Sequence, residues 1–107
     1  MGFFGLFGGS ADINSGVEEA RGREGAKIID VREPGEFAQG HIEGAVNVPL
    51  SSLAAGIAAA ARKDEPLYVY CLSGARSSSA CGQLQRMGYA DVTDIGGINR
   101  WKGPIAR

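Results

Sequence analysis

Apolar residues along the chain gather in short runs separated by polar and glycine-rich stretches. The runs at 27–31, 46–48 and 67–70 combine β-branched, leucine and tyrosine residues over the length of a strand, and Val92 with its neighbours forms a fourth. Short, nearly continuous apolar runs of this kind are typical of buried strands. The pattern therefore predicts strands at these four places.

Between these strands, capping signals and the spacing of apolar residues predict helices. A Ser-x-x-Glu capping box predicts a short helix at about 15–23. Pro34 suits the first turn of a second short helix, and apolar spacing predicts a third at about 53–62. A fourth helix ends at Gly88, and a last one is expected around Trp101. The fourth helix carries one small or apolar face: Ala80, Cys81, Leu84 and Met87.

Strands that alternate with short helices predict an α/β domain around a mainly parallel sheet. At 107 residues the chain suffices for one domain with a modest core and is too short for two. We expect this domain at 13–107, after an apolar, Gly/Phe-rich tail at 1–12. The simplest interpretation of the tail is a loose end or a strand against the domain, and the alternative is a contact with a partner or a second copy.

The candidate chemistry lies at Cys71, which directly follows the run at 67–70 and precedes a short loop and a helix. Backbone N–H groups of such a loop, unobstructed at Gly74 and Ala75, converge on an anion, and the helix N-terminus adds partial positive charge. Both effects favour a thiolate over a thiol. Arg76 adds a forked cationic group that suits an oxyanion beside the sulfur or braces the loop. The sequence therefore predicts anionic sulfur chemistry.

The length of this loop distinguishes between the classes of chemistry that a cysteine loop performs. Cysteine phosphatases and related arsenate reductases place five residues between cysteine and arginine, because their loop wraps a tetrahedral oxyanion. This chain has four between Cys71 and Arg76: Leu72, Ser73, Gly74 and Ala75. The smaller loop has room for one extra sulfur atom on the cysteine, and it is too small for a phosphoryl group.

From this loop outward, the chain resembles the rhodanese family of sulfurtransferases. The N-terminal signature of the family is matched by Asp30-Val31-Arg32, Glu36-Phe37, Gly40-His41-Ile42 and Gly44-Ala45-Val46-Asn47-Val48-Pro49, and its C-terminal signature by Gly88-Tyr89, Val92, Gly96-Gly97-Ile98 and Trp101. The match covers about 25–103 in the order and spacing of the family. It implies the α/β rhodanese-like fold, with a central, mainly parallel five-stranded sheet flanked by short helices.

The resemblance implies a thiosulfate sulfurtransferase that works by double displacement. The Cys71 thiolate takes the outer sulfur of a small anionic donor such as thiosulfate, and loop N–H groups from Leu72 to Ser77 hold the resulting persulfide. Cyanide, a thiol or a protein then accepts the sulfur, and no cofactor is implied. The charge of Arg76 favours thiosulfate over 3-mercaptopyruvate as the donor.

Two other functions stay open. One is a persulfide carrier that accepts sulfur from a partner enzyme, with weak turnover of its own, and that uses the apolar tail for docking. The other is a phosphatase or arsenate reductase, which the length of the loop opposes.

Residues outside the loop are assigned to structure. Asp30, Arg32 and Glu36 form either a catalytic acid–base set or a charge network that fixes the loops, and we favour the network. His41 has no expected catalytic role, because a thiolate that its loop has already deprotonated needs no base. Cys81 is expected in the core rather than as a resolving cysteine. Trp101 is expected in the core or a lid, and a single histidine with two distant cysteines supplies no metal site.

Charge and cysteine content limit the partners. A net charge of −1 without a dense Lys/Arg cluster argues against nucleic acid and anionic membranes. The apolar start is too short to span a bilayer and lacks a secretory signal pattern, and Leu6 stands where myristoylation requires serine or threonine. Two cysteines are too few for a disulfide framework. We therefore expect a cytoplasmic protein without a membrane span.

Overall fold

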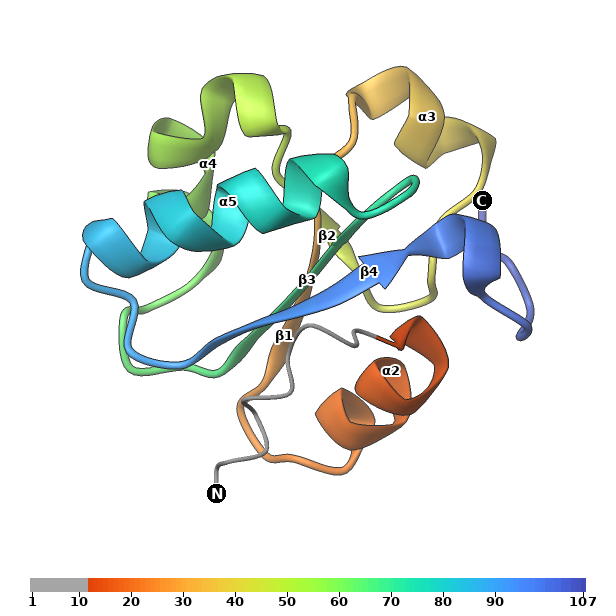
Figure 1. Ribbon diagram of the computed structural model, residues 1–107, viewed down its shortest axis with the longest axis horizontal. Coiled ribbons are helices and arrows are strands. Elements are labelled where there is room, and N and C mark those ends of the chain that lie inside the picture. Colours follow the sequence, from red (N-terminus) through yellow and green to blue (C-terminus); the bar gives the residue numbers. More distant parts are fainter. Residues whose placement is uncertain (1–11) are drawn as a thin grey trace.

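The computed structural model describes residues 12–107, which form an α/β sandwich around one sheet (Figure 1). The strands are β1 (Lys27–Asp30), β2 (Val46–Asn47), β3 (Leu67–Cys71) and β4 (Val92–Gly97). They lie in the order β2-β1-β3-β4, and every neighbouring pair is parallel. The predicted parallel α/β architecture is confirmed. The sheet has four strands over 12–107 rather than five, because this part of the chain contains only four apolar runs of strand length.

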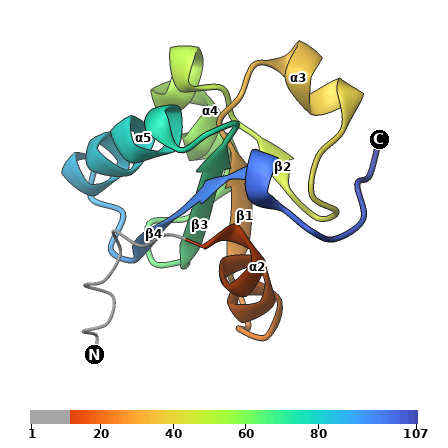
Figure 2. The same cartoon turned by 45° about the vertical axis from the view of Figure 1, so that its right-hand side comes forward.

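Helices cover both faces of the sheet, with α4 and α5 on one side and α2 on the other (Figures 1 and 2). Their bounds are α2 (Ile13–Arg21), α3 (Pro34–Gln39), α4 (Leu53–Ala60) and α5 (Ala75–Arg86), with single 3₁₀ turns η2 (Leu50–Ser52) and η3 (Ile98–Arg100). None of the helices described in this range is long and apolar enough to cross a membrane.

Alternating side chains of the strands divide the core into two layers. On the α4/α5 face, Ile29 and Val69 pack with Leu84 of α5. On the α2 face, Ile28 and Tyr68 belong to the other apolar cluster. The strands are therefore buried from both sides, as their nearly continuous apolar sequences predict.

The first helix begins earlier than its sequence pattern suggested. The side chain of Asp12 caps α2 by accepting a hydrogen bond from the Asn14 N–H at 3.1 Å, so the predicted capping box at 15–18 was wrong. Ser15 lies inside the first turn, where its hydroxyl donates to the Asp12 carboxylate at 3.1 Å. The expected terminal helix is only the 3₁₀ turn η3, which Trp101 follows. The predicted tail at 1–12 lies, except for Asp12, outside the described residues.

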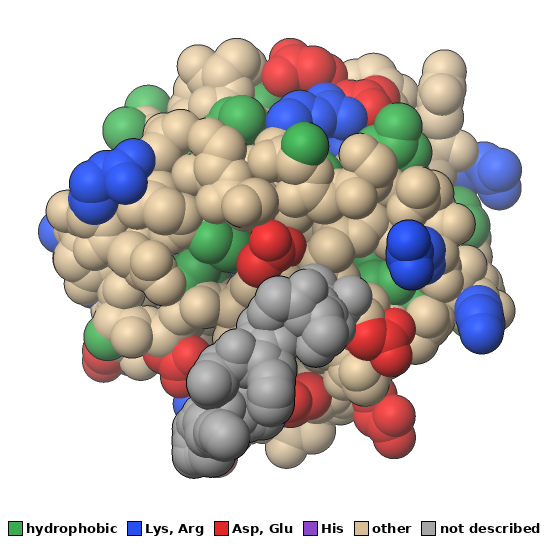
Figure 3. Space-filling view, in the orientation of Figure 1, with side chains coloured by type: hydrophobic (Ala, Val, Ile, Leu, Met, Phe, Trp, Pro, Cys, Tyr) green, Lys and Arg blue, Asp and Glu red, His purple; other side chains and the backbone are tan. Residues whose placement is uncertain are grey.

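The carboxyl ends of the parallel strands share one edge of the sheet, where ligands bind in such folds. Cys71 is the last residue of β3 at this edge, and the ends of β1 and β4 flank it. On the face shown in Figure 3, basic side chains are scattered among acidic ones rather than gathered in one patch.

Candidate active site

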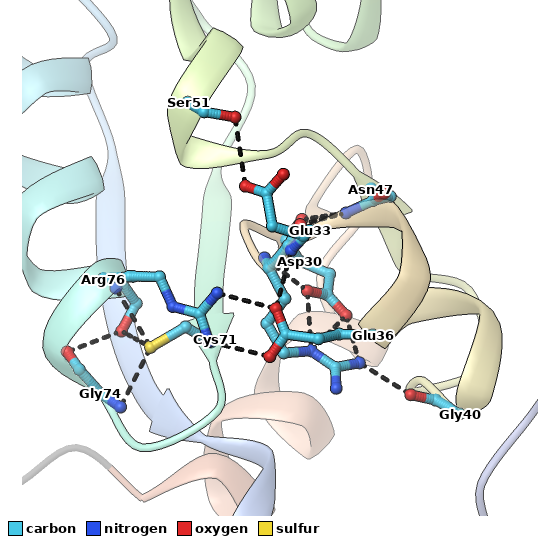
Figure 4. Close-up of polar contacts among 11 residues, drawn as sticks. Asp30, Glu33, Glu36, Gly40, Asn47, Ser51, Cys71, Gly74 and Arg76 are labelled. Atoms are coloured by element: carbon cyan, nitrogen blue, oxygen red, sulfur yellow. Dashed lines mark hydrogen bonds and ion pairs between the residues drawn. The ribbon is translucent and has the colours of Figure 1, made fainter.

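The sulfur of Cys71 lies at the focus of two backbone N–H groups (Figure 4). The N–H of Gly74 donates to Sγ at 3.0 Å, and the N–H of Ser77 donates at 3.3 Å. Cys71 itself is 1% exposed, so these bonds act in a site with little water. Hydrogen bonds to sulfur stabilise its anionic form, and they are stronger where water is excluded.

Gly74 turns the chain from β3 into α5. It is the N-cap of α5 with φ +111°, a backbone conformation that favours glycine, and this turn directs its N–H back to the sulfur. The next two residues, Ala75 and Arg76, open α5, and N–H groups of a first helical turn have no partner within the helix. The positive end of the helix thus lies beside Cys71.

The end of β4 supports the first half of the loop. A Cβ built on Gly97 would collide with the carbonyl oxygen of Leu72 and lie 2.7 Å from Cα of Ser73. Only glycine therefore allows β4 to approach this closely. The Asn99 N–H also donates to the Leu72 carbonyl at 3.1 Å, whereas the Leu72 side chain is 46% exposed.

Sequence reasoning missed Asp94, which holds the second half of the loop. The hydroxyl of Ser77, which is fully buried, donates to Asp94 Oδ1 at 2.8 Å and lies 3.6 Å from Cys71 Sγ. Asp94 Oδ1 also accepts the Gly96 N–H at 3.0 Å, across an irregularity in the pairing of β4 with β3. The available signal was a carboxylate inside a strand whose other residues are β-branched or glycine.

Arg76 forms a bidentate ion pair with Glu36 of α3 (Figure 4). Its Nη1 donates to Oε1 at 2.8 Å and its Nη2 donates to Oε2 at 3.0 Å. Oε1 also accepts the N–H of Glu33 at 2.9 Å. The Arg76 guanidinium, followed by this backbone bond, lowers the pKa of Glu36 to about 2. Glu36 is therefore a carboxylate near neutral pH.

The other charged residues form a separate pair. Arg32 Nη2 donates to Asp30 Oδ2 at 2.8 Å, and both side chains are almost wholly buried. The same nitrogen donates to the Gly40 carbonyl at 2.7 Å, while Asn47 Nδ2 donates to the carbonyls of Asp30 and Arg32 at 3.0 and 2.9 Å. The predicted network is thus two pairs: Asp30–Arg32 fixes the end of β1, and Glu36 turns to the loop arginine.

The remaining sequence candidates lie in structural positions. His41 Nδ1 is 2.8 Å from the Phe37 carbonyl, and its ring stacks on the Phe37 ring with centroids 3.7 Å apart. Cys81 is 8% exposed on the inner face of α5, and burial, with a smaller effect of the Asp94 charge, raises the pKa of its thiol to about 12. Trp101 packs against the α2-side cluster.

The similarity to known proteins agrees with this fold. The profile of the Rhodanese-like domain matches residues 15–104. The chain belongs to the rhodanese-like family. Within it, the uncharacterized protein YqhL of Bacillus subtilis is 43% identical over 90 residues, which are 82% of this chain and 71% of YqhL. Thiosulfate sulfurtransferase GlpE of Pseudomonas aeruginosa is 40% identical over 79 residues, 73% of this chain and 71% of GlpE.

A solved rhodanese structure supports the same conclusion. The rhodanese with anions from Escherichia coli superposes with a TM-score of 0.71 at 36% identity, over 77% of this chain and 98% of that one. The rhodanese-like fold and the family resemblance predicted from the sequence are therefore confirmed.

Proposed function

We propose that this rhodanese-like domain is a sulfurtransferase that moves sulfane sulfur from thiosulfate or a similar donor to cyanide, a thiol or a protein, through a persulfide on Cys71. The observation that carries the proposal is the convergence of the Gly74 and Ser77 N–H groups on Cys71 Sγ at the end of β3. The similarity to thiosulfate sulfurtransferases GlpE and PspE, at 40% and 41% identity, supports it.

In the first half-reaction, the Cys71 thiolate attacks the outer sulfur of thiosulfate. The new S–S bond forms as the old one breaks, and sulfite leaves with the bonding electron pair. The three negative charges of the reactants become one on the Cys71 persulfide and two on sulfite. The N–H groups of Ala75 and Arg76, at the open start of α5, are our candidates for holding the terminal sulfur of the persulfide.

In the second half-reaction, a nucleophile takes that terminal sulfur. Cyanide attacks it, thiocyanate forms, and the electron pair of the broken S–S bond returns to Cys71 as a thiolate. The Gly74 and Ser77 N–H groups lie where they stabilise this leaving thiolate. The Asp30–Arg32 and Glu36–Arg76 pairs act as positioning groups for the loops around it.

Intact-protein mass measurement tests the first half-reaction directly. Wild-type protein incubated with thiosulfate should gain the mass of one sulfur, and a reducing thiol should remove it. Cys71→Ser should gain nothing, whereas the matched variant Cys81→Ser should gain the sulfur, because Cys81 is packed in the core. Sulfur gain by Cys71→Ser, or none by the wild type with any sulfane donor, would refute the proposal.

A persulfide carrier is the second candidate, and the exposed Leu72 side chain favours it. An apolar side chain next to Cys71, 46% exposed, is available to a protein partner rather than to a small anion. Loading rates of Cys71 from thiosulfate and from a purified cysteine desulfurase with cysteine separate the two functions. A large preference for the desulfurase supports the carrier, and a large preference for thiosulfate supports the enzyme.

A further inference from the structure

The arginine that follows the sulfur-binding loop already has an anionic partner. Arg76 comes directly after the loop, but its two terminal nitrogens both donate to Glu36, at 2.8 and 3.0 Å. The side chains of Arg76 and Glu36 are 34% and 32% exposed, so the pair faces the solvent from which a donor arrives. A sulfonate must therefore compete with the Glu36 carboxylate for the Nη1 and Nη2 groups of the guanidinium.

Glu36 is held in this position by its own helix. Its Oε1 accepts the Glu33 N–H at 2.9 Å, and this reciprocal capping box fixes the start of α3. None of the residues of α3 is fully buried, so polar contacts contribute, together with the stacking of Phe37 on His41, to where the helix lies. The contact between Glu36 and Arg76 is therefore a built feature of the α3 start, not a chance surface pair.

The pair changes the charge that a donor meets. With Glu36 ionised, the charges of the guanidinium and the carboxylate sum to zero, and the attraction that an approaching anion loses through this neutralisation is proportional to its own negative charge. Thiosulfate carries two charges, whereas a persulfide anion or an organic thiosulfonate carries one. Compared with an unpaired arginine, the neutral pair thus weakens the binding of the dianion more than the binding of the monoanion.

We propose that Glu36 is a specificity-determining residue, which neutralises Arg76 and so biases the Cys71 site toward sulfane-sulfur donors with one negative charge over the thiosulfate dianion. The proposal rests on sulfur transfer through Cys71 and adds the charge class of the donor to it. Glu36 contacts Arg76 rather than the reacting sulfur atoms, so it acts as a positioning and charge-setting group.

Two donors with the same scissile bond isolate the charge. Thiosulfate loses sulfite, and the methanethiosulfonate anion, CH₃SO₂S⁻, loses methanesulfinate, in each case after the Cys71 thiolate attacks the outer sulfur. The measured quantity is kcat/KM for thiosulfate divided by kcat/KM for methanethiosulfonate, with cyanide as acceptor. Any change in the reactivity of Cys71 itself affects both donors and cancels in this ratio.

Glu36→Gln removes the charge and keeps an oxygen that accepts from Glu33 and Arg76. We expect the ratio to rise about fivefold, the size of one unit-charge interaction at a partly exposed site. The matched control is Glu33→Gln, which removes a charge from the same helix start. Glu33 is exposed, accepts from the Ser51 hydroxyl at 3.1 Å, and raises the pKa of Arg76 less than Glu36 does. Its ratio should stay within about twofold of wild type, and higher salt should shrink the Glu36→Gln effect.

The alternatives give different results. An unchanged ratio in Glu36→Gln overturns the proposal, as does an equal rise in Glu33→Gln, which would assign the effect to general charge. A fall in both rates at a constant ratio would also overturn it, because Glu36 would then only hold the loop. If wild-type protein forms no persulfide from either donor, the proposed function itself fails, and the mass measurement identifies that case.

Discussion

Gly74→Ala tests whether the direction of one backbone N–H sustains sulfur transfer. Gly74 has φ +111°, and a Cβ built there would find its nearest neighbour, Cα of Gly96, at 3.9 Å, an ordinary contact. Alanine therefore fits sterically, and its only conflict is with the left-handed backbone. To relieve that conflict the loop must rotate, which turns the Gly74 N–H away from Cys71 Sγ, now at 3.0 Å.

The expected cost to stability is about 1 kcal/mol. A left-handed alanine costs roughly 1–2 kcal/mol, and the lower entropy of the unfolded chain returns about 0.5 kcal/mol. The expected cost to activity is larger. A hydrogen bond to a charged group contributes about 1.5–3 kcal/mol, so its loss should reduce turnover by about 10- to 100-fold.

Gly25→Ala is the matched control. Gly25 has φ +82° and open space around a built Cβ, so it should lose a similar stability in urea unfolding. It precedes β1, at the opposite edge of the sheet from Cys71, so its thiosulfate–cyanide turnover should remain that of the wild type. Equal turnover in the two variants, with equal stability loss, would show that the Gly74 N–H is not part of the chemistry.

Three further predictions test other parts of the site. Cys71→Ser should abolish thiocyanate formation, whereas Cys81→Ser should keep most of it and lower the urea midpoint; equal loss in both would make Cys81 a redox partner. Gly97→Ala should lower turnover by about 100-fold or more, because its Cβ displaces the loop backbone; turnover at the wild-type level would show that the close approach is unimportant. The Glu36–Arg76 pair lowers the Glu36 pKa from 4.5 to about 2. The pair therefore stabilises the folded state above pH 4.5, by less than about 1 kcal/mol at this exposure, and this stabilisation is lost as the pH falls toward 2. The stability difference between wild type and Glu36→Gln should therefore shrink over that range, and a constant difference would contradict the cause assigned to the shift.

The sequence predicted the elements whose burial pattern is local. The run at 67–70 became β3, all of whose residues are buried, and the face with Ala80, Cys81 and Leu84 became the buried face of α5. The start of α2 was misplaced because two capping patterns compete there. Asp12 caps the helix three residues before the Ser-x-x-Glu motif, and this start buries Ile13 along with Val17.

The loop was predictable for the same reason, since Cys71, Gly74 and Ser77 lie within one short segment that a strand and a helix fix at both ends. The pairing of the charged residues was not predictable from the sequence. Asp30, Arg32 and Glu36 are close in sequence, yet Glu36 pairs with an arginine 40 positions later, and the Ser77 hydroxyl pairs with Asp94, 17 positions later. Composition identifies such charges, but only the strand order β2-β1-β3-β4 brings them together.

This division between local and distant contacts has a consequence for how donor choice varies. The groups that contact Cys71 Sγ come from the loop and the start of α5, so a change there should alter transfer from every donor. The net charge of the Glu36–Arg76 pair beside the loop depends on α3, which has no buried residue and contributes nothing to either core cluster. A change in α3 therefore costs little core packing, and the two N–H groups that contact Cys71 Sγ come from outside α3. Under the charge argument above, substitutions at Glu36 shift the donor preference while the chemistry at Cys71 stays the same.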